Sequence, residues 1–386
     1  MKFKKYICVR YHHLTQKSYK EYYLEEAQNA GIIVEYWDTT FLFFTDDYGQ
    51  EDSSYLAKTR KISTFSELEQ AIQEQDIKNT LFVTTSTFEY KVRKLHLLFA
   101  RHNCIVAGFG RNMYPVANSK PLKRLKRITP RRIFNYLLNR YLDIEVKFDK
   151  IKTFDIVFLA GEKGWQALGR ISECKLEKMD VIRINSCDYD TCIENQNDQC
   201  LFAHNYILYL DQYLPLHPDM LMVERCTIPE DLYYHSLNDY FSKLEKKMGM
   251  PVVIAAHPKA LKYKEKNYFD GRLVLFDQTQ QLSKYATVVL AHNSVSINYP
   301  IIYGIPLHFI TSAVIEKYAY SVHHDVQIFA EMFGSDWEYW DDPRVSDLNF
   351  RIDRNKYASY KFLYQSSPDA EQRLTKNIFI DFLLGK

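Results

Sequence analysis

Residues 251–312 read PVVIAAHPKALKYKEKNYFDGRLVLFDQTQQLSKYATVVLAHNSVSINYPIIYGIPLHFITS, and this stretch decides the predicted fold. It contains three short apolar runs, at residues 252–256, 273–276 and 287–291, each followed by polar residues. Runs of this length and composition are typical of buried parallel strands. Helix-like segments separate them, the first a basic segment that opens at His257-Pro258, since Pro is tolerated in a first helical turn. The alternation predicts a doubly wound α/β domain.

Polar side chains follow these predicted strands at the points where the strands end. In open α/β sheets, ligands bind outside the carboxyl ends of the strands. We therefore expect His257, Asp277, Ser294 and Ser296 to line one crevice. Ser294 or Ser296 would begin the next helix, where backbone N–H groups and the helix dipole favour a phosphate. The alternative is that both serines are ordinary helix caps.

The rest of the chain repeats the alternation of strands and helices. A length of 386 residues predicts two domains, and the polar, turn-rich residues 194–199 mark a boundary between residues 1–199 and 200–386. We predict two doubly wound, Rossmann-like domains that face a cleft. The predicted strands of the first domain are residues 3–10, 32–37, 80–84, 104–107, 154–160 and 180–185, and residues 206–210 begin the second sheet.

Composition and charge exclude several function classes. The apolar fraction is 46%, the charged fraction 25% and the net charge +2, so nothing indicates a nucleic-acid-binding protein. The seven Cys include no C-x-x-C pair, which favours reduced thiols in the cytoplasm. We see neither the apolar region of a signal peptide at the N-terminus nor an apolar run as long as a membrane span.

Residues 119–140 are strongly basic, with apolar residues interleaved. One interpretation is a solvated pair of helices that covers the sheet. The other is a surface that binds anionic headgroups or an anionic lipid-linked substrate. The sequence leaves both open. The basic residues are Lys120, Lys123, Arg124, Lys126, Arg127, Arg131, Arg132 and Arg140.

His257-Pro258 after a strand, Ser294-Val295-Ser296 at a later helix start and the following Tyr303-Gly304-Ile305-Pro306 resemble the GT-B superfamily of nucleotide-sugar glycosyltransferases. The resemblance is to bacterial enzymes of capsule and lipopolysaccharide assembly that use CMP-activated acidic sugars, the sialyl and Kdo transferases. It implies that His257 contacts the nucleotide phosphate, that Ser294 and Ser296 bind it, and that Asp277 meets the ribose or base. Pro258, Lys259 and Asn293 complete the expected donor site.

The acidic-acidic-Gly motif that carries the catalytic base in the sialyltransferases is absent. Asp46-Asp47-Tyr48-Gly49 is interrupted by Tyr48, and Asp211-Gln212-Tyr213 lacks the Gly. An inverting transfer still needs a group that deprotonates the acceptor hydroxyl. Carboxylates and imidazoles at predicted strand ends are the candidates. Asp211 is our first choice, Asp188 and His257 are further catalytic candidates, and His12 and Asp190 are expected on the acceptor side.

The chain offers no D-x-D motif between apolar strands. Asp188-Tyr189-Asp190 has the spacing but falls in a predicted loop, where both carboxylates could be turn-formers. With a CMP donor, a helix N-terminus, His257 and Lys259 could neutralise the single phosphate without a metal. We therefore expect no metal and no cofactor apart from the donor.

The predicted function is a glycosyltransferase, inverting and metal-independent, that moves a sugar from a nucleotide donor to a glycan or lipid-linked acceptor in bacterial surface-polysaccharide assembly. We expect it in the cytoplasm, peripheral to the membrane. His-Pro with Ser-x-Ser also resembles CDP-glycerol glycerophosphotransferases and UDP-sugar 2-epimerases of the same fold. A second alternative, from another class, is a non-catalytic subunit that binds nucleotide or glycan.

Overall fold

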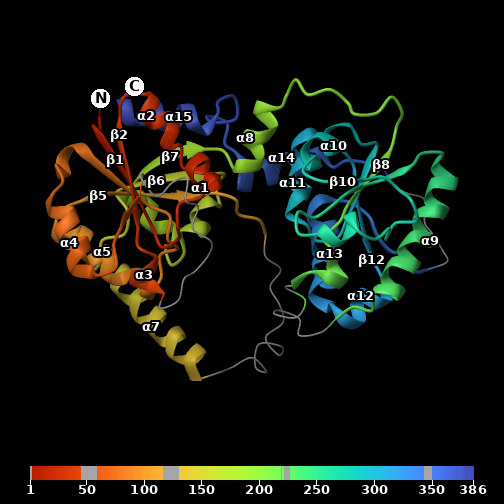
Figure 1. The fold of residues 1–386 in the computed structure, drawn as a ribbon, viewed down its shortest axis with the longest axis horizontal. Helices are drawn as coiled ribbons and strands as arrows, with labels where there is room; N and C mark the ends of the chain where they lie inside the picture. The colour runs from red at the N-terminus through yellow and green to blue at the C-terminus, as the bar shows by residue number, and fades with distance from the viewer. Residues whose placement is uncertain (1, 45–58, 116–129, 219, 221–226, 343–349) are drawn as a thin grey trace. The chain divides into compact units, whose positions relative to one another are not determined.

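The computed structural model describes residues 2–44, 59–115, 130–218, 220, 227–342 and 350–386. The chain divides into two compact units, each built on one parallel sheet (Figure 1). The predicted α/β class, with two doubly wound Rossmann-like domains, is confirmed. The first unit comprises Met1–Met113, Pro121–Asp190 and Phe362–Lys386, and the second comprises Tyr114–Lys120 and Thr191–Lys361.

The first unit holds a seven-stranded sheet in the order β3-β2-β1-β4-β5-β6-β7, with every pair parallel. The chain begins with the interior strand β1 and adds β2 and β3 on one side of it. It then adds β4 to β7 in succession on the other side. The strands are β1 (Lys5–Arg10), β2 (Ile33–Asp38), β3 (Thr59–Lys61), β4 (Thr80–Thr84), β5 (Ile105–Gly110), β6 (Ile156–Ala160) and β7 (Asp180–Ile184).

Side chains alternate between the two faces of this sheet, and each face has its own core. Tyr6 and Cys8 of β1 belong to one buried cluster, whereas Ile7 and Val9 belong to another. Helices cover both faces, as a doubly wound sheet requires. They are α1 (Gln16–Glu21), α2 (Leu24–Asn29), α3 (Thr40–Phe43), α4 (Phe65–Gln73), α5 (Arg93–Arg101), α7 (Pro130–Lys147), α8 (Cys187–Glu194) and α15 (Thr375–Leu384).

The second unit holds a six-stranded sheet in the order β10-β9-β8-β11-β12-β13, again entirely parallel. Its strands are β8 (Ile207–Leu210), β9 (Val252–Ala255), β10 (Val274–Leu275), β11 (Val288–Ala291), β12 (Leu307–Thr311) and β13 (Trp337–Tyr339). Its helices are α9 (Glu230–Met248), α10 (Thr279–Tyr285), α11 (Asn298–Tyr303), α12 (Ala313–Tyr318), α13 (Tyr320–Phe333) and α14 (Arg354–Tyr360).

One local prediction differs from the structure. The basic helix expected after His257-Pro258 is replaced by a turn and a short 3-10 helix at Leu261–Lys264. Two further features are not evident from sequence patterns. Residues 334–343 contain β13, because Trp337–Tyr339 pairs with β12 at the edge of the sheet. Residues 16–29 form two helices instead of one, since Tyr23 adopts a left-handed conformation with φ of 55°.

The C-terminal segment corrects the predicted domain division, which assigned every residue after 199 to the second domain. Residues Phe362–Lys386 return to the first unit, where α15 covers one face of the sheet. Phe379 packs edge-on against Tyr6 at 5.3 Å between ring centroids and against Phe158 at 5.2 Å. An apolar stripe along a helix predicts that one face is buried, but it does not identify the sheet that the helix covers.

Candidate functional site

The second sheet has its topological switch point between β8 and β11, where successive connections leave in opposite directions. Ligands of open α/β sheets bind outside the carboxyl ends of the strands at such a point. Gln212, after β8, donates from Nε2 to Oδ1 of Asn293, after β11, at 2.9 Å. The Asn293 backbone N–H donates back to Gln212 Oε1 at 3.3 Å. This reciprocal pair spans the switch point.

Asn293 also reaches a carboxylate from the C-terminal half of this unit. Its Nδ2 donates to Oδ2 of Asp325, on α13, at 2.8 Å. The Asn293 side chain is therefore held by two groups of the second unit, Gln212 after β8 and Asp325 on α13, and it remains only partly buried. Sequence reasoning named Asn293 but missed Gln212 and Asp325, because their proximity depends on strand order.

His257 lies in the turn that follows β9, and it is also partly buried. The Lys259 backbone N–H donates to Nδ1 of His257 at 3.2 Å, so one ring nitrogen of His257 is used within this turn. The ring of His217, in the loop after β8, meets the His257 ring edge-on with centroids 4.9 Å apart. Two imidazoles from neighbouring strand ends thus lie together. Pro258 and Lys259 are exposed beside them.

A cavity of about 860 Å³ lies next to this pair of imidazoles and includes His217 in its wall. The loop after β8 supplies one side, and the first turn of α9 supplies the other. Its size falls in the range of small-molecule sites. The described lining residues are Pro215, Leu216, His217, Pro218, Met220, Thr227, Ile228, Pro229, Glu230, Asp231 and Leu232.

Ser294 and Ser296 follow β11. Ser294 precedes a short 3-10 helix at Val295–Ile297 that continues into α11, and Ser296 lies within it. Ser294 is the N-cap, and its Oγ accepts a hydrogen bond from the Ser296 backbone N–H at 3.2 Å. Both side chains are partly buried. The capping interpretation of Ser294 is thus correct. Capping uses one lone pair of the hydroxyl, so it does not exclude contact with a ligand.

Asp277 is exposed in the loop after β10, with a left-handed φ of 57°. The strand order places β10 at the sheet edge, with β9 and β8 between it and β11. At about 4.8 Å per strand, Asp277 is roughly three strand spacings from the end of β11. The structure therefore groups His257 with Asn293 and the serines along one sheet edge, and it leaves Asp277 at the far end of that edge.

Asp211, the first-choice base, is almost completely buried at 4% exposure. Its Oδ2 accepts a hydrogen bond from the Tyr263 hydroxyl at 3.0 Å, and its Oδ1 has no hydrogen-bond partner among the described residues. Burial raises the pKa of this carboxyl to about 6, although the backbone N–H groups of Tyr213 and His257 act in the opposite direction. A carboxyl with such a pKa can exchange protons near neutral pH.

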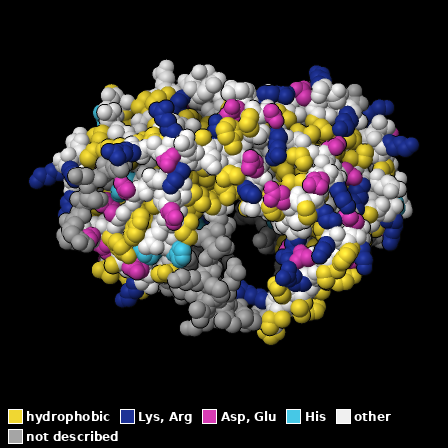
Figure 2. Space-filling model, turned by 180° about the vertical axis from the view of Figure 1, so that it is seen from behind, with side chains coloured by type: hydrophobic (Ala, Val, Ile, Leu, Met, Phe, Trp, Pro, Cys, Tyr) yellow, Lys and Arg dark blue, Asp and Glu magenta, His cyan; other side chains and the backbone are white. Residues whose placement is uncertain are grey.

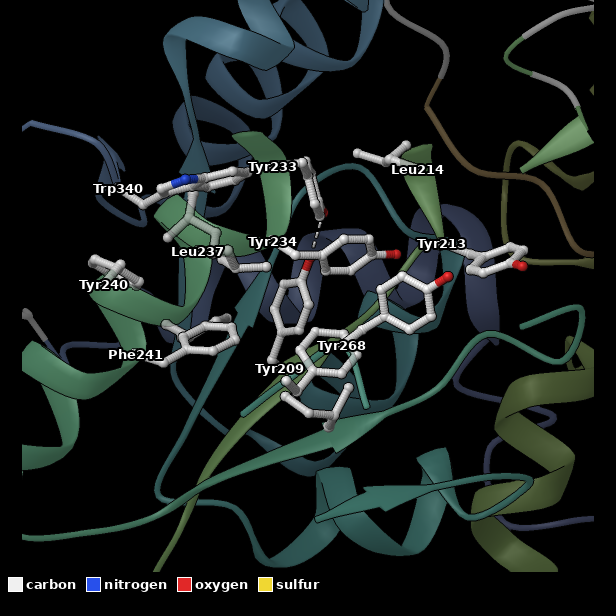
Figure 3. Close-up of a cluster of buried hydrophobic side chains, with 14 of the residues drawn as sticks. Tyr209, Tyr213, Leu214, Tyr233, Tyr234, Leu237, Tyr240, Phe241, Tyr268 and Trp340 are labelled. Atoms are coloured by element: carbon white, nitrogen blue, oxygen red, sulfur yellow. Dashed lines mark hydrogen bonds between the residues drawn. The ribbon is translucent and has the colours of Figure 1, made fainter. Parts of the chain in front are cut away.

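Tyr263, the hydrogen-bond partner of Asp211, belongs to a buried cluster rich in tyrosines, part of which Figure 3 shows. Tyr234 and Tyr263 share a hydrogen bond at 2.8 Å, and Tyr209 and Tyr233 share another at 2.9 Å. The hydroxyl of Tyr209 also lies 2.9 Å from Nε2 of His292, whose Nδ1 donates to the Ile310 carbonyl at 2.6 Å. Burial lowers the pKa of His292 to about 4, so this imidazole is neutral and belongs to the core.

The three site residues predicted in the first unit differ in their surroundings. Asp190 Oδ1 accepts from Asn185 Nδ2 at 3.1 Å and from the Thr375 backbone N–H at 3.0 Å, which ties β7 to α15, and burial raises its pKa. Asp188 is partly buried in the first turn of α8, not in a loop. His12 is partly buried after β1, and burial, Arg10 and Lys91 lower its pKa.

One buried histidine–carboxyl pair of the first unit was missed. His13 Nδ1 lies 2.6 Å from Oδ2 of Asp38, and both side chains are almost fully buried. Oδ1 of Asp38 accepts from the Thr40 backbone N–H at 2.9 Å. The carboxyl ends of β1 and β2 are joined by this pair. The His12-His13 dipeptide after a strand was the available signal, but the sequence does not show that β2 lies beside β1.

Two predictions concern features beyond these side chains. Within the described ranges, no group of three or more His, Cys, Asp or Glu could hold a metal ion. No helix in the described part of the chain is long and apolar enough to cross a membrane. Residues 116–129 of the basic segment and residues 46–49 lie outside the described residues, and Pro130–Lys147 form α7.

No protein-family model and no curated protein matches the chain. Among solved structures, a variant of the wall teichoic acid polymerase TagF superposes with a TM-score of 0.51 at 12% identity, over 99% of this chain and 88% of that one. UDP-GlcNAc 2-epimerase from Methanocaldococcus jannaschii gives a TM-score of 0.47 at 11% identity, over 99% of this chain and 100% of that one. The glycotransferase of kitacinnamycin gives 0.48 at 11% identity with the same coverage. The likeness to TagF extends over nearly the whole chain and shows the fold alone.

Proposed function

We propose that the chain is a nucleotide-sugar-dependent glycosyltransferase of bacterial surface-polysaccharide assembly, with its donor site at the carboxyl edge of the second sheet. The observation that carries this proposal is the Gln212–Asn293 pair at the switch point between β8 and β11. Polar side chains converge there on elements that the sheet holds rigidly. The fold shared with TagF, a polymerase of wall teichoic acid, supports the choice of polymer assembly.

His257 is the proposed contact to the donor phosphate, with His217 beside it. Lys259 adds a cation on the same turn, and Ser294 and Ser296 offer hydroxyls after β11. Together these groups would stabilise the negative charge that develops as the bond from the anomeric carbon to the phosphate oxygen breaks. No divalent metal is needed for that role. Asp277, at the outer strand, is proposed to meet the donor at its far end.

We propose that the base that deprotonates the acceptor hydroxyl is one of the candidates that solvent can reach. Asp211 is enclosed by tyrosines at 4% exposure, so we assign it to positioning the loops after β8 and β9. Asp188 and His257 are partly buried and remain candidate bases. On the acceptor side, His12 remains a candidate, whereas the contacts of Asp190 favour a structural role. The proposed acceptor is a glycan, free or lipid-linked.

The donor nucleotide separates this proposal from its alternatives. A CMP-activated acidic sugar is the donor that His257-Pro258 and Ser294-Val295-Ser296 favour. A CDP-glycerol-type transferase is the second candidate, because the likeness to a teichoic acid polymerase favours it. The first experiment is a thermal-shift screen of CMP, CDP, UDP and GDP, with and without EDTA. Wild type and His257→Ala are compared, and His235→Ala, an exposed position on α9, is the matched control.

A nucleotide at ~100 times its Kd should add about 2.7 kcal/mol of stability, which is easily measured. We expect a cytidine nucleotide to stabilise wild type and His235→Ala in EDTA, and the shift to disappear in His257→Ala. CMP over CDP would favour the CMP-sugar transferase, and CDP over CMP would favour the glycerol-phosphate transferase. Turnover of a nucleotide sugar without acceptor would indicate an epimerase. No response to any nucleotide would overturn the proposed donor site.

A further inference from the structure

Helix α7 carries a row of large apolar side chains on the face that it turns away from the first sheet. Six of them, in the helix or just beyond it, are between 49% and 63% exposed. At 100° per residue they fall within an arc of about 100°, so they form one stripe along the helix. Figure 2 shows hydrophobic side chains beside Lys and Arg along α7. The six, which we call the α7 stripe, are Ile133, Phe134, Leu137, Tyr141, Ile144 and Phe148.

The opposite face of α7 is firmly attached to the first unit. Leu142 and Val146 are buried in its core. Glu145 accepts from Arg93 Nε at 2.6 Å, and Asp143 accepts from Arg170 Nε at 2.5 Å. The helix therefore has one face in the core and one apolar face directed to solvent. An exposed apolar surface of this extent on a packed helix marks an interaction site.

The exposed charged side chains of the described part of α7 are basic. Arg140 and Lys147 lie along one border of the stripe, and the exposed Arg132 lies about 60° further round the helix. The two acidic residues of the helix are paired within the first unit, Asp143 with Arg170 and Arg140, and Glu145 with Arg93. Residues 119–142 contain eight Lys or Arg and no Asp or Glu. The surface therefore combines an apolar band with a cationic border, which is the pattern of helices that lie on anionic bilayers.

We propose that α7 docks the protein on the surface of an anionic lipid bilayer. The α7 stripe enters the boundary between headgroups and acyl chains, and Arg132, Arg140 and Lys147 meet lipid phosphates. From residue 133 to residue 148 the stripe is about 22 Å long, so the helix lies in the plane of the membrane. This assignment gives the membrane role to the outer face of α7, while its inner face covers the first unit's core.

A second copy of the chain is the main competing occupant, and the charge pattern disfavours it. Two α7 stripes facing each other would bring the cationic border of one copy against that of the other. Like charges in contact at an interface oppose association. A bilayer that contains anionic lipid supplies the complementary charge. The proposal does not rest on the proposed function, since it needs neither nucleotide nor acceptor.

The test is flotation of the full chain with vesicles of phosphatidylcholine alone and with added phosphatidylglycerol. The variant is Phe134→Ser with Leu137→Ser. The matched control is Leu232→Ser with Leu261→Ser, two similarly exposed apolar residues of the second unit. We expect wild type and control to bind the anionic vesicles and the stripe variant to lose at least about tenfold in partitioning, since each buried apolar side chain is worth about a factor of ten.

A second variant tests the electrostatic part. Arg132→Glu with Arg140→Glu should weaken binding to anionic vesicles, and added salt should release the wild type. Circular dichroism and size-exclusion chromatography are run on every variant. Absence of wild-type binding to anionic vesicles would overturn the proposal. So would a wild-type dimer that becomes a monomer only in the stripe variant, or equal loss of flotation in the control.

Discussion

The two units share one strand order but differ at the carboxyl ends of their strands. In the first unit several polar residues there are buried and bonded to other parts of the same unit. His13 pairs with Asp38, and Asn185 Oδ1 accepts from the Ser366 hydroxyl at 2.6 Å. In the second unit His257 and Asn293 remain partly buried, although Asn293 is bonded to Gln212 and Asp325, and His217 beside His257 lines a cavity. A sheet sets where polar side chains gather, and the segments that cover it decide whether a ligand can reach them.

The covering segment of the first unit is the returning C-terminal chain. Ser186 Oγ, after β7, donates to Gln365 Oε1 at 2.6 Å, and the Glu162 backbone N–H donates to the Phe362 carbonyl at 2.9 Å. The ends of β6 and β7 are thus occupied by residues 362–386. The structure describes no equivalent cover for the end of β11 in the second unit. The predictions below test this difference.

The largest effect is expected at Gly161, after β6. Its φ is +66°, and an added Cβ would lie 2.6 Å from backbone atoms of Leu363 and Tyr364. We expect Gly161→Ala to lower the free energy of unfolding of the first unit by about 3 kcal/mol or more. Gly304→Ala is the matched control, because Gly304 has a φ of +68° but no described atom within 4 Å of an added Cβ. It should cost only about 1 kcal/mol. Urea denaturation measures both, and equal losses would show that the close approach does not matter.

The next largest effect is the pH dependence of the second unit through Asp211. The ordinary pKa of an Asp carboxyl is 3.8, and the pKa of Asp211 in the folded protein is about 6. Its contribution to the free energy of unfolding is therefore complete below pH 3.8 and is lost as the pH rises through about 6. Relative to Asp211→Asn, wild type should lose about 2–3 kcal/mol between about pH 4 and pH 7.

His292 acts with the opposite sign, because its pKa is lowered to about 4 and its contribution is lost as the pH falls. In wild type the two opposite pH dependences of the free energy of unfolding partly cancel. The difference in this free energy between wild type and Asp211→Asn isolates the contribution of Asp211. Hydrogen exchange over α9 measures the free energy of opening of this unit. A difference that does not change with pH would contradict the assigned burial of Asp211.

Asp190→Ala should destabilise the first unit by about 1–2 kcal/mol, because it removes the acceptor of the Thr375 N–H and one of three acceptors of Asn185 Nδ2. Nucleotide binding should be unchanged, since the second unit is unaffected. Asp188→Ala, on the same helix, is the control for stability. Chemical denaturation and calorimetric titration with nucleotide are the two measurements. Loss of transfer activity with unchanged stability would contradict the structural role and would support the prediction that Asp190 contacts the acceptor.

The smallest effect compares one cap from each unit. Thr15 Oγ1 accepts from the Ser18 N–H at 3.2 Å, and Ser294 Oγ accepts from the Ser296 N–H at 3.2 Å. Replacing either by Ala should cost about 1 kcal/mol of stability. Only Ser294→Ala should also weaken nucleotide binding, by about tenfold, because it removes a phosphate contact. Calorimetric titration of both variants decides this, and equal affinities would leave Ser294 as a cap alone.

The sequence predicted the central strands well where a strand buried on both faces is a continuous apolar run. β6 (Ile156–Ala160) and β11 (Val288–Ala291) are examples that needed no knowledge of their neighbours. The break at Tyr23 could not be predicted in this way. Its hydroxyl accepts from Arg111 Nη1 at 2.9 Å, a contact between residues 88 positions apart. Edge strands such as β13 were missed for the same reason, because pairing with β12 defines them.

The candidate site was predicted as a set of strand ends, without their order. His257, Asn293 and Ser294 follow strands of one sheet edge, as expected. The distance of Asp277 from β11, and the proximity of Gln212 to Asn293, depend on which strands are neighbours. The burial of each polar side chain was the other quantity that could not be predicted from the sequence. Asp211 follows an apolar run just as His257 does, but tyrosines from α9 and the turn after β9 enclose only Asp211.

The return of residues 362–386 to the first unit has a consequence for synthesis on the ribosome. Translation proceeds from the N-terminus, and domains generally fold as they emerge. The second unit, through Lys361, is made before α15, whose Phe379 fills the core beside Tyr6 and Phe158. Part of one apolar sheet face of the nascent first unit therefore stays uncovered until the second unit has been synthesised. The first unit is thus translated first but completes its folding last. During that interval its exposed apolar surface is available to chaperones.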